Sequence, residues 1–407
     1  MSRPRKRGNG EGSIYPVNGG WRGYVWFTGT DGMRYRKYVK GKSYKETRDA
    51  WVKLHTRAKA GPVPASVPTV AQHMAYWLAE VVEPNLAPKT HERYEMISRL
   101  YIVPRLGTKR LDRLQVRDIR AFLNQLRQSC QCCAQGKDAA RPEHLRRCCA
   151  IGHCCGQRLS ERTIKDARDT LRAALSSAVG EELLARNAAS IVRLPTPRKR
   201  RNKWWSADEA RAFLESARRD DDPLYAAYVL ILVLGLRRGE ALGLTWDDVN
   251  FNAAEIAVTW QLQRASGQLH HRETKTPGSA AALPLPPICL AALKLRAEKQ
   301  EQDRTAAGRI WQDAPLVFTT RLGTPFEPRN FNRQFAARCR KSGARTIRVH
   351  DTRRTCASLL VALDVHPRVA MQILRHSRIT VTMDVYSEVP SEATQEALRR
   401  LGESLDG

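Results

Sequence analysis

Long apolar stretches are missing from this chain of 407 residues. No run approaches the roughly 18 consecutive apolar residues that a membrane-spanning helix needs, which excludes a protein built from such helices. The N-terminal sequence MSRPRKRGNGEGS is basic, but it lacks the apolar core of a secretory signal peptide. We therefore expect the protein to work in the cytoplasm.

The phosphate-binding loop of the P-loop NTPases is absent as well. Gly41-Lys42-Ser43 resembles the end of that motif, but Arg36 occupies the position of its first glycine. This class of ATP- and GTP-hydrolysing enzymes is therefore excluded.

Acidic residues are scarce. The chain has 41 Asp and Glu against 69 Lys and Arg, which gives a formal net charge of +28 and an isoelectric point near 10.2. Such an excess favours a polyanionic partner, most often nucleic acid. Arg outnumbers Lys, and the guanidinium group suits bidentate contacts to phosphate. The alternative is a ribosome-like or merely soluble basic protein.

Residues 1–62 form the first predicted module. Short runs rich in Tyr, Trp and Val are separated by Asn18-Gly19-Gly20 and Thr30-Asp31-Gly32, which are typical hairpin turns. Ser43-Tyr-Lys-Glu46 has the spacing of a capping box and opens a helix to about Lys59. We expect three strands, at Ser13–Pro16, Trp21–Thr28 and Arg34–Lys40, and then one helix. Such a sheet can lie in a DNA groove, with Arg22, Arg34, Arg36 and Lys37 as candidate contacts and Lys40 nearby. A solvated basic sheet is the alternative.

Residues 66–192 form a second, helical module, which follows the linker-like stretch Gly61–Pro68. Apolar residues recur there at steps of three and four, as in amphipathic helices. The pattern predicts helices over Val70–Val82, Lys89–Val103, Gln115–Gln128 and about Glu161–Val179. Four helices with basic residues beside the apolar stripes fit a domain that grips DNA, although core packing alone would also produce the stripes.

Cysteines are concentrated in an insertion at residues 130–155 of the helical module. Seven of the ten cysteines lie there, and an odd number of thiols in a cytoplasmic chain argues against disulfides. Cys130 and Cys133 have C-x2-C spacing, and Cys149 and Cys154 provide a second pair, which is enough for one tetrahedral zinc site with four thiolates. Other ligand combinations stay open, and they draw on Cys132, Cys148, Cys155, His144 and His153. Free thiols or redox chemistry are the alternatives to a structural zinc ion.

A basic linker, RLPTPRKRRNK, occupies residues 193–203. Its two prolines suppress regular structure, and its charges can follow a row of phosphates. We expect this segment to cross the DNA, with contacts from Arg198, Lys199, Arg200 and Arg201. A plain solvated linker is the alternative.

Residues 204–407 are predicted to form a mostly helical domain with a small sheet. A second capping box, Ser206-Ala-Asp-Glu209, opens it. Helical patterns cover Asp208–Arg218, Leu224–Leu234, Arg238–Leu244, Pro287–Arg304, Arg329–Lys341, Asp351–Ala362 and Pro367–Leu374. Short β-like runs lie at Glu255–Thr259, Ala280–Leu285 and Leu316–Thr319.

The residues with the most chemical character lie in three motifs. His350 and Arg353 are three residues apart, so they share one face of a helix, and His376 precedes Tyr386 in LRHSRITVTMDVY. Arg237 follows an apolar helix in GLRRGEALGL, where Glu240 could orient a neighbour. Lys275 lies in a polar turn between two β-like runs. Such a set suggests a nucleophile beside cationic groups that hold an anion, and the net charge indicates that the anion is a DNA phosphate.

In these motifs the chain resembles the tyrosine recombinases of the phage integrase family, which include phage and integrative-plasmid integrases. GLRRGEALGLTWDDV is similar to the family's first arginine box, HDTRRT to its H-x-x-R box and LRHS to its third box. The resemblance covers residues 8–390. It implies a multidomain, mostly α fold with small β-sheets: an arm-type DNA-binding module, a helical core-binding domain, and a mixed α+β catalytic domain with a C-terminal docking tail.

The resemblance also implies a mechanism, with Tyr386 as the nucleophile. Two guanidiniums would stabilise the phosphate, and one imidazole would accept the tyrosine proton while the other fixes the phosphate in place. The lysine would protonate the leaving 5′-oxygen. These roles fall to Arg237, Arg353, His350, His376 and Lys275. DNA would be cut through a 3′-phosphotyrosine and rejoined without metal ion or ATP, by a tetramer on its attachment sites, with an accessory directionality factor as a further partner.

The chain departs from the family pattern at three points. Thr352-Arg353-Arg354 stands where Leu-Arg-His is common, Arg375 stands where Gly usually precedes the third-box His, and Ala280–Ala282 replace the arginine usual after Ser279. None of these removes a catalytic group. Two other functions share part of the pattern: a type IB topoisomerase, which relaxes DNA without a specific site, and a non-catalytic DNA-binding regulator.

Overall fold

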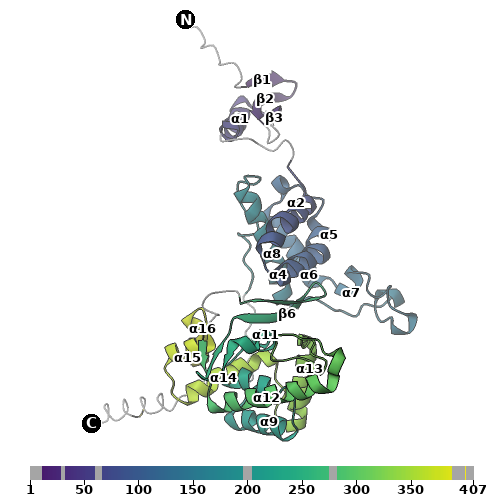
Figure 1. The fold of residues 1–407 in the computed structure, drawn as a ribbon. Coiled ribbons are helices and arrows are strands. Elements are labelled where there is room, and N and C mark those ends of the chain that lie inside the picture. Colours follow the sequence, from purple (N-terminus) through teal and green to yellow (C-terminus); the bar gives the residue numbers. More distant parts are fainter. Residues whose placement is uncertain are drawn as a thin grey trace. The chain divides into compact units, whose positions relative to one another are not determined.

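The computed structural model describes residues 12–28, 33–59, 67–195, 204–274, 282–386 and 399. The chain divides into two compact units between Arg198 and Lys199 (Figure 1). The first contains a small N-terminal sheet and a helical module, and the second contains the motifs singled out in the sequence. No helix in the described ranges is both long enough and apolar enough to cross a bilayer.

The N-terminal part is an antiparallel sheet of three strands, β1 (Ser13–Val17), β2 (Gly20–Thr28) and β3 (Arg34–Gly41), followed by α1 (Tyr44–Lys59). This is the predicted arrangement. The Trp51 indole of α1 donates a 2.8 Å hydrogen bond to the Tyr24 carbonyl and holds the helix on the sheet. At the start of the helix, the Ser43 hydroxyl accepts from the Glu46 N–H, while the Glu46 carboxylate accepts from Lys42 instead of Ser43.

The helical module is built around α8 (Glu161–Gly180), whose apolar stripe is buried in the core of the module. Against it pack α6 (Val116–Gln128), α2 (Val70–Tyr76) and α4 (Pro88–Ile97). The two predicted helices at 70–82 and 89–103 continue past their α-helical parts. They run through the π-helical η1 (Trp77–Val82) and η2 (Ser98–Ile102) into α3 (Glu83–Asn85) and α5 (Val103–Leu106). Both π segments lie just before a proline, which lacks the N–H that a regular turn needs.

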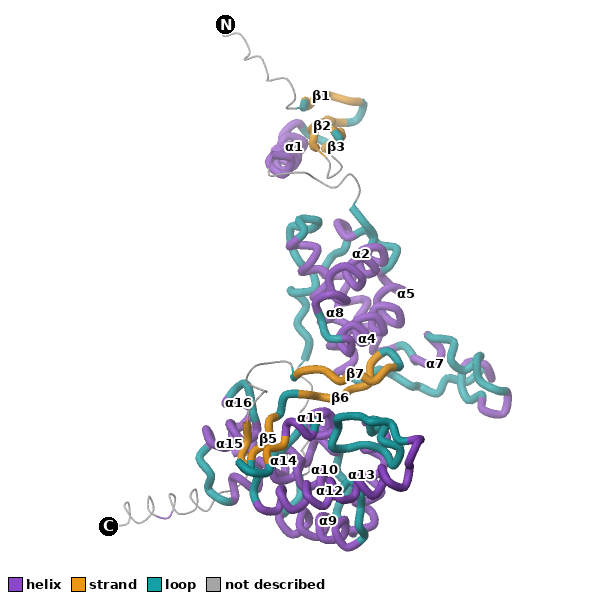
Figure 2. Tube along the Cα trace, viewed as in Figure 1, coloured by secondary structure: helices purple, strands orange, loops and turns teal. Residues whose placement is uncertain are grey.

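The second unit is mostly helical, with short strands (Figure 2). Its helices are α9 (Ala207–Arg219), α10 (Tyr225–Val233), α11 (Arg238–Gly243), α12 (Pro287–Ala307), α13 (Pro328–Ser342), α14 (Thr352–Ala362), α15 (Pro367–Leu374) and α16 (Ile379–Tyr386). The strands β4 (Val249–Asn250), β5 (Glu255–Ala257) and β8 (Ala282–Pro284) form one antiparallel sheet, and β6 (Trp260–Ala265) and β7 (Gln268–Glu273) form a hairpin.

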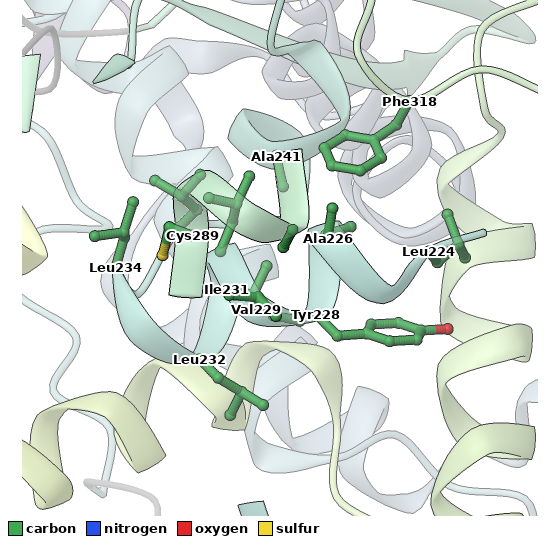
Figure 3. Close-up of a cluster of buried hydrophobic side chains, with 14 of the residues drawn as sticks. Leu224, Ala226, Tyr228, Val229, Ile231, Leu232, Leu234, Ala241, Cys289 and Phe318 are labelled. Carbon is green, nitrogen blue, oxygen red and sulfur yellow. The ribbon is translucent and has the colours of Figure 1, made fainter. Parts of the chain in front are cut away.

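Helix α10 lies at the centre of this unit (Figure 3). Its sequence YAAYVLILV is apolar on every side, as expected of a helix that is covered all round. Helices α9, α11, α12 and α14 all pack against it. The segment that follows α10 carries Arg237, so the position of Arg237 is set by the packing of this helix.

One prediction for this unit was wrong, and one hairpin was missed. Leu316–Thr319 is not a strand, because Leu316 and Thr319 each form only an isolated bridge. The β6–β7 hairpin was not predicted, since its strands WQLQRA and QLHHRE are mostly polar. Its turn residues Ser266 and Gly267 both have positive φ, at 48° and 79°, so the Ser-Gly pair was the signal for it.

Candidate active site

Arg237 is positioned by a glycine turn after α10. Gly235 has φ of 59°, and a Cβ added there would lie 2.7 Å from a Leu374 methyl carbon. The next residues lead into α11, where Arg237 is the N-cap. The Glu240 carboxylate accepts from the Arg237 backbone N–H at 2.9 Å and from its guanidinium. The Glu240 interaction predicted from the sequence is thus a contact that fixes the direction of Arg237.

Arg353 lies beside this turn, on the first turn of α14. It is 5% exposed, and its Nη1 donates to the Gly235 carbonyl. Its Nη2 is buried and meets no hydrogen-bond partner among the described residues. Burial, and then the charges of Arg237 and Arg375, lower the pKa of Arg353 to about 9. This guanidinium is still charged at neutral pH, and one of its donors has no protein acceptor in the described structure.

The two histidines share this positive environment. Partial burial, and then Arg353, lower the pKa of His350, which lies in the 3-10 turn Val349–Asp351. Burial, Arg353 and Arg237 lower the pKa of His376 to about 4. One ring nitrogen, Nδ1 of His376, lies 2.9 Å from the hydroxyl of the fully buried Thr382. Both imidazoles are therefore neutral at pH 7. Arg237 and Arg353 repel each other and lie close to these two neutral histidines, so a bound anion would stabilise the group of four residues.

Tyr386 ends α16, which packs against α14 and α15. Its hydroxyl donates to the Val365 carbonyl. Burial and the nearby Asp364 carboxylate raise the pKa of Tyr386. In this conformation the neighbours of Tyr386 therefore favour the protonated hydroxyl.

Arg375 belongs to the same group of residues but was noted in the sequence only as a departure from a pattern. Its backbone is left-handed, with φ of 50°, at the end of α15. The side chain is buried, and its Nη2 lies 2.7 Å from the Glu240 carboxylate. Burial alone would raise the pKa of Glu240, but Arg375 and Arg237 outweigh burial and lower it.

Two groups of predicted residues lie outside the described residues. Lys275 falls in the stretch 275–281, and the basic linker residues Arg198, Lys199, Arg200 and Arg201 fall in 196–203. Their roles remain predictions.

The family assignment rests on two matches to family models, one in each of the two units of the chain. Residues 203–392 match the phage integrase family, and residues 69–127 match the N-terminal SAM-like domain of phage integrases. The chain belongs to the phage integrase family of tyrosine recombinases. The fold class predicted from the sequence is that of this family.

Known members of the phage integrase family resemble the chain over most of its length. An integrase of Saccharopolyspora erythraea is 26% identical over 440 aligned positions, which cover 94% of each chain. The Tn1549 transposon integrase in complex with a circular intermediate DNA has a TM-score of 0.62 at 20% identity and covers 83% of this chain and 100% of that one. A lambda integrase tetramer bound to a Holliday junction has a TM-score of 0.50 at 16% identity, covering 93% and 96%.

The cysteine insertion of this integrase brings sulfur atoms together, but not in the predicted set. The sulfurs of Cys130, Cys133, Cys148 and Cys154 all lie within 4.8 Å of one another, so Cys148 takes the place predicted for Cys149. The reason is the buried Asp138, whose carboxylate accepts from the N–H groups of Arg147, Cys148 and Ala150. This bends the chain so that Cys148 is buried and Cys149 is exposed. His144 and His153 are not in the cluster.

The N-terminal sheet of the integrase has one face that combines basic and aromatic side chains. Arg22 lies 4.3 Å from the centre of the Tyr38 ring, and Arg36 lies 4.3 Å from that of Trp26. Arg34 pairs with Thr28 and lies over the same Trp26 ring. Lys37 alternates with them: it pairs with the buried Val25 and lies on the opposite face, near Phe27. The strand register thus separates Lys37 from the other three predicted DNA contacts.

Proposed function

We propose that this integrase-family chain is a site-specific DNA recombinase that integrates or excises a mobile element. The observation that carries the proposal is the buried Nη2 of Arg353, which meets no acceptor among the described residues and lies in one cationic group with Arg237 and two neutral histidines. A buried donor without an acceptor costs about 1–3 kcal/mol, so the site is arranged for a ligand that supplies the acceptor. A DNA phosphate supplies it and is attracted by the surrounding charge.

The proposed catalysis is electrostatic stabilisation of the pentacovalent phosphate. Arg237 and Arg353 donate hydrogen bonds to its non-bridging oxygens, and Glu240 fixes the orientation of the Arg237 side chain. Preorganised donors of this kind act where the negative charge develops. His376, fixed by Thr382, hydrogen-bonds the same phosphate.

Bond exchange at phosphorus then follows from Tyr386. Its oxygen forms a bond to phosphorus, the bond to the 5′-oxygen breaks, and that oxygen takes a proton from Lys275. The tyrosine proton passes to His350, whose lowered pKa keeps it neutral and able to accept. The Tyr386 hydroxyl must first leave the Val365 carbonyl. The 3′-phosphotyrosine retains the energy of the original bond, so a 5′-hydroxyl of another strand can reseal the DNA.

The test is covalent trapping on DNA. Mixed with a nicked duplex that carries its attachment core, the full-length protein is expected to form an adduct that survives SDS. A duplex of the same composition without the core gives little adduct. Equal adduct on both duplexes, together with relaxation of plasmids that lack the site, would favour a topoisomerase, and no adduct on either would favour a DNA-binding regulator.

The pH dependence of cleavage follows from the two histidines. Their pKa values lie below the 6.5 of a free imidazole, so kcat/KM for cleavage should stay on its plateau as pH falls through 6.5 and decline only below it. In the unfolded chain the same histidines take up protons near pH 6.5. The unfolding free energy should therefore fall as pH drops from above 6.5 toward 4. A rate that declines already above pH 6.5 would contradict the assignment of a neutral His350.

We also propose that the basic and aromatic face of the N-terminal sheet contacts DNA. Arg36→Gln should weaken binding and reduce the slope of log affinity against log salt by about 0.9, the value for one phosphate contact. Lys37→Gln removes the same charge from the opposite face and serves as the matched control, with an unchanged slope. Equal slopes for the two variants would show that DNA binding depends on the net charge of the protein and not on one face of the sheet.

Strand exchange joins four DNA strands, so we propose that the active assembly is a tetramer on DNA, docked through the C-terminal tail after Tyr386. An accessory directionality factor is a further proposed partner. The proposed domain limits are 1–62, 66–192 and 204–407 with the linker 193–203.

We further propose that the insertion binds one structural zinc ion through Cys130, Cys133, Cys148 and Cys154, whose tetrahedral thiolate set fits zinc.

A further inference from the structure

Two clustered cysteines are left over when one tetrahedral site is filled. Cys132 and Cys155 form a second group with Cys148, in which all three sulfurs lie within 4.8 Å of one another. Cys148 therefore belongs to both groups. Cys132 is fully buried although it is a potential ligand with no place in the first site.

The spacing of the sulfurs matches metal-bound thiolates. A zinc–sulfur bond of about 2.3 Å in a tetrahedron places neighbouring sulfurs about 3.8 Å apart, whereas a disulfide brings them to about 2.05 Å. Within the first group, the Cys133 sulfur is 3.4 Å from that of Cys148 and 3.9 Å from that of Cys154. The Cys130 sulfur is 3.9 Å from Cys148 and 3.7 Å from Cys155, which connects the two groups.

We propose that the insertion holds two zinc ions that share the thiolates of Cys130 and Cys148. Cys133 and Cys154 complete one tetrahedron, and Cys132 and Cys155 complete the other, so six cysteines give each ion four ligands. The proposal rests on the zinc function proposed above and extends it to a second ion. Cys149 is outside both groups and exposed, which accounts for the seventh cysteine of the insertion.

The surroundings of the six sulfurs suit such a cluster. Six thiolates and two divalent ions leave a net charge of minus two, which needs nearby donors. The Arg141 guanidinium lies 3.6 Å from the Cys132 sulfur and is fixed by Asp138 at 2.8 Å. The Cys155 N–H donates to the Cys148 sulfur at 3.3 Å. Asp138 thus sets both the turn that buries Cys148 and the cation beside Cys132, as outer groups around metal sites commonly do.

Metal content of the purified full-length protein tests the number of ions. We expect two zinc ions per chain by elemental analysis after dialysis without chelator. One ion per chain would overturn the shared cluster and leave the single-zinc site standing, and no zinc would overturn both. With cadmium in place of zinc, two NMR signals of equal intensity, coupled through the shared sulfurs, are expected from the unaltered protein, and a single signal would contradict the proposal.

Two serine variants test the assignment of ligands. Cys132→Ser should lower the content from two ions to one, and Cys149→Ser, the matched control, should keep both. Circular dichroism shows whether each variant is folded. A Cys132→Ser protein that keeps two ions would overturn the assignment, and the cadmium experiment still decides the question if this variant does not fold.

A separate observation concerns Arg375. One buried carboxylate, Glu240, holds two arginines: Arg237 through its backbone N–H and guanidinium, and Arg375 at 2.7 Å. The Arg375 backbone is left-handed, a conformation in which glycine is unstrained and arginine is not. A charged side chain at such a position, with 1% of its side-chain surface exposed, is best explained by what it contacts.

We infer that Arg375 is a positioning residue for the recombinase reaction, acting through Glu240 on Arg237. Without it, Glu240 has one cationic partner in place of two and draws the Arg237 guanidinium towards itself, away from the phosphate. With it, the carboxylate is shared between the two arginines. This inference also rests on the function proposed above.

Arg375→Gly removes the charge and relieves the backbone strain, but it also breaks a buried ion pair. We expect DNA affinity close to that of the unaltered protein, a lower melting temperature, and a single-turnover cleavage rate per folded molecule that falls on the order of 10²-fold. Arg375→Lys should recover part of the rate. Because Arg375 is one of the charges that lower the pKa of His376, the acid limb of the rate profile should move to higher pH in the glycine variant. An unchanged rate and limb, or a rate loss that follows the melting temperature alone, would overturn the inference; if no adduct forms with the unaltered protein, the proposed function has failed instead.

Discussion

Tyr386→Phe is expected to abolish the covalent protein–DNA adduct completely. The variant lacks the oxygen that forms the bond to phosphorus. It also loses the hydrogen bond to the Val365 carbonyl, which leaves an acceptor that solvent can reach at this half-buried position. DNA binding should therefore be retained, as measured by gel shift, while adduct on the nicked duplex falls below detection.

Tyr225→Phe is the matched control for that experiment. Tyr225 opens α10 in the same unit and also lies partly buried, but it packs against the core far along the chain from the third box. Its variant should form the adduct at the normal rate. Adduct formation by Tyr386→Phe, or its loss in both variants, would show that the nucleophile has been wrongly assigned.

Patterns repeated over many residues allowed most of the fold to be predicted. The helix over Glu161–Val179 is found as α8, because its stripe of apolar residues can be buried on only one side. The apolar run before Arg237 is found as the central helix α10, since such a helix is stable only when it is covered. The motifs also located Arg237, His350, Arg353 and His376 in one electrostatic group.

Features set by single contacts could not be predicted in this way. Cys148 replaces Cys149 because Asp138 binds three backbone N–H groups from a distance along the chain, and no spacing rule contains that contact. The opposite directions of Lys37 and Arg36, in contrast, could have been predicted from the sequence, because neighbouring residues of a strand point to opposite faces. Arg375 could have been recognised by its position alone, where a glycine is usual.

The hydroxyl direction of Tyr386 is a further property that no motif contains. The motifs predict a nucleophile next to cationic residues, but the α16 backbone sets which acceptor the hydroxyl reaches, and here it is Val365. Under the proposed mechanism, cleavage therefore requires the Tyr386 hydroxyl to leave the Val365 carbonyl. The proposed catalytic arginines, in contrast, are held by the Gly235 carbonyl and the Glu240 carboxylate and are already in place.

Arg353→Lys is expected to reduce the single-turnover cleavage rate by on the order of 10²–10³-fold, the usual loss when one preorganised donor is removed. Lysine keeps the positive charge, but its single ammonium group cannot contact the Gly235 carbonyl and a phosphate oxygen in the fork geometry of a guanidinium. Affinity for DNA should change little, because the many other basic residues supply it.

Arg296→Lys separates this effect from a general loss of stability. Arg296 is as buried as Arg353, but its guanidinium is bonded to the Val317 carbonyl and to Thr319, in a part of the unit that carries none of the proposed catalytic residues. Its replacement should lower the unfolding free energy by about 1–3 kcal/mol and leave the cleavage rate per folded molecule unchanged. If both variants lose rate in proportion to stability, Arg353 acts through the fold; if only Arg353→Lys loses rate, its buried Nη2 is the donor that the phosphate requires.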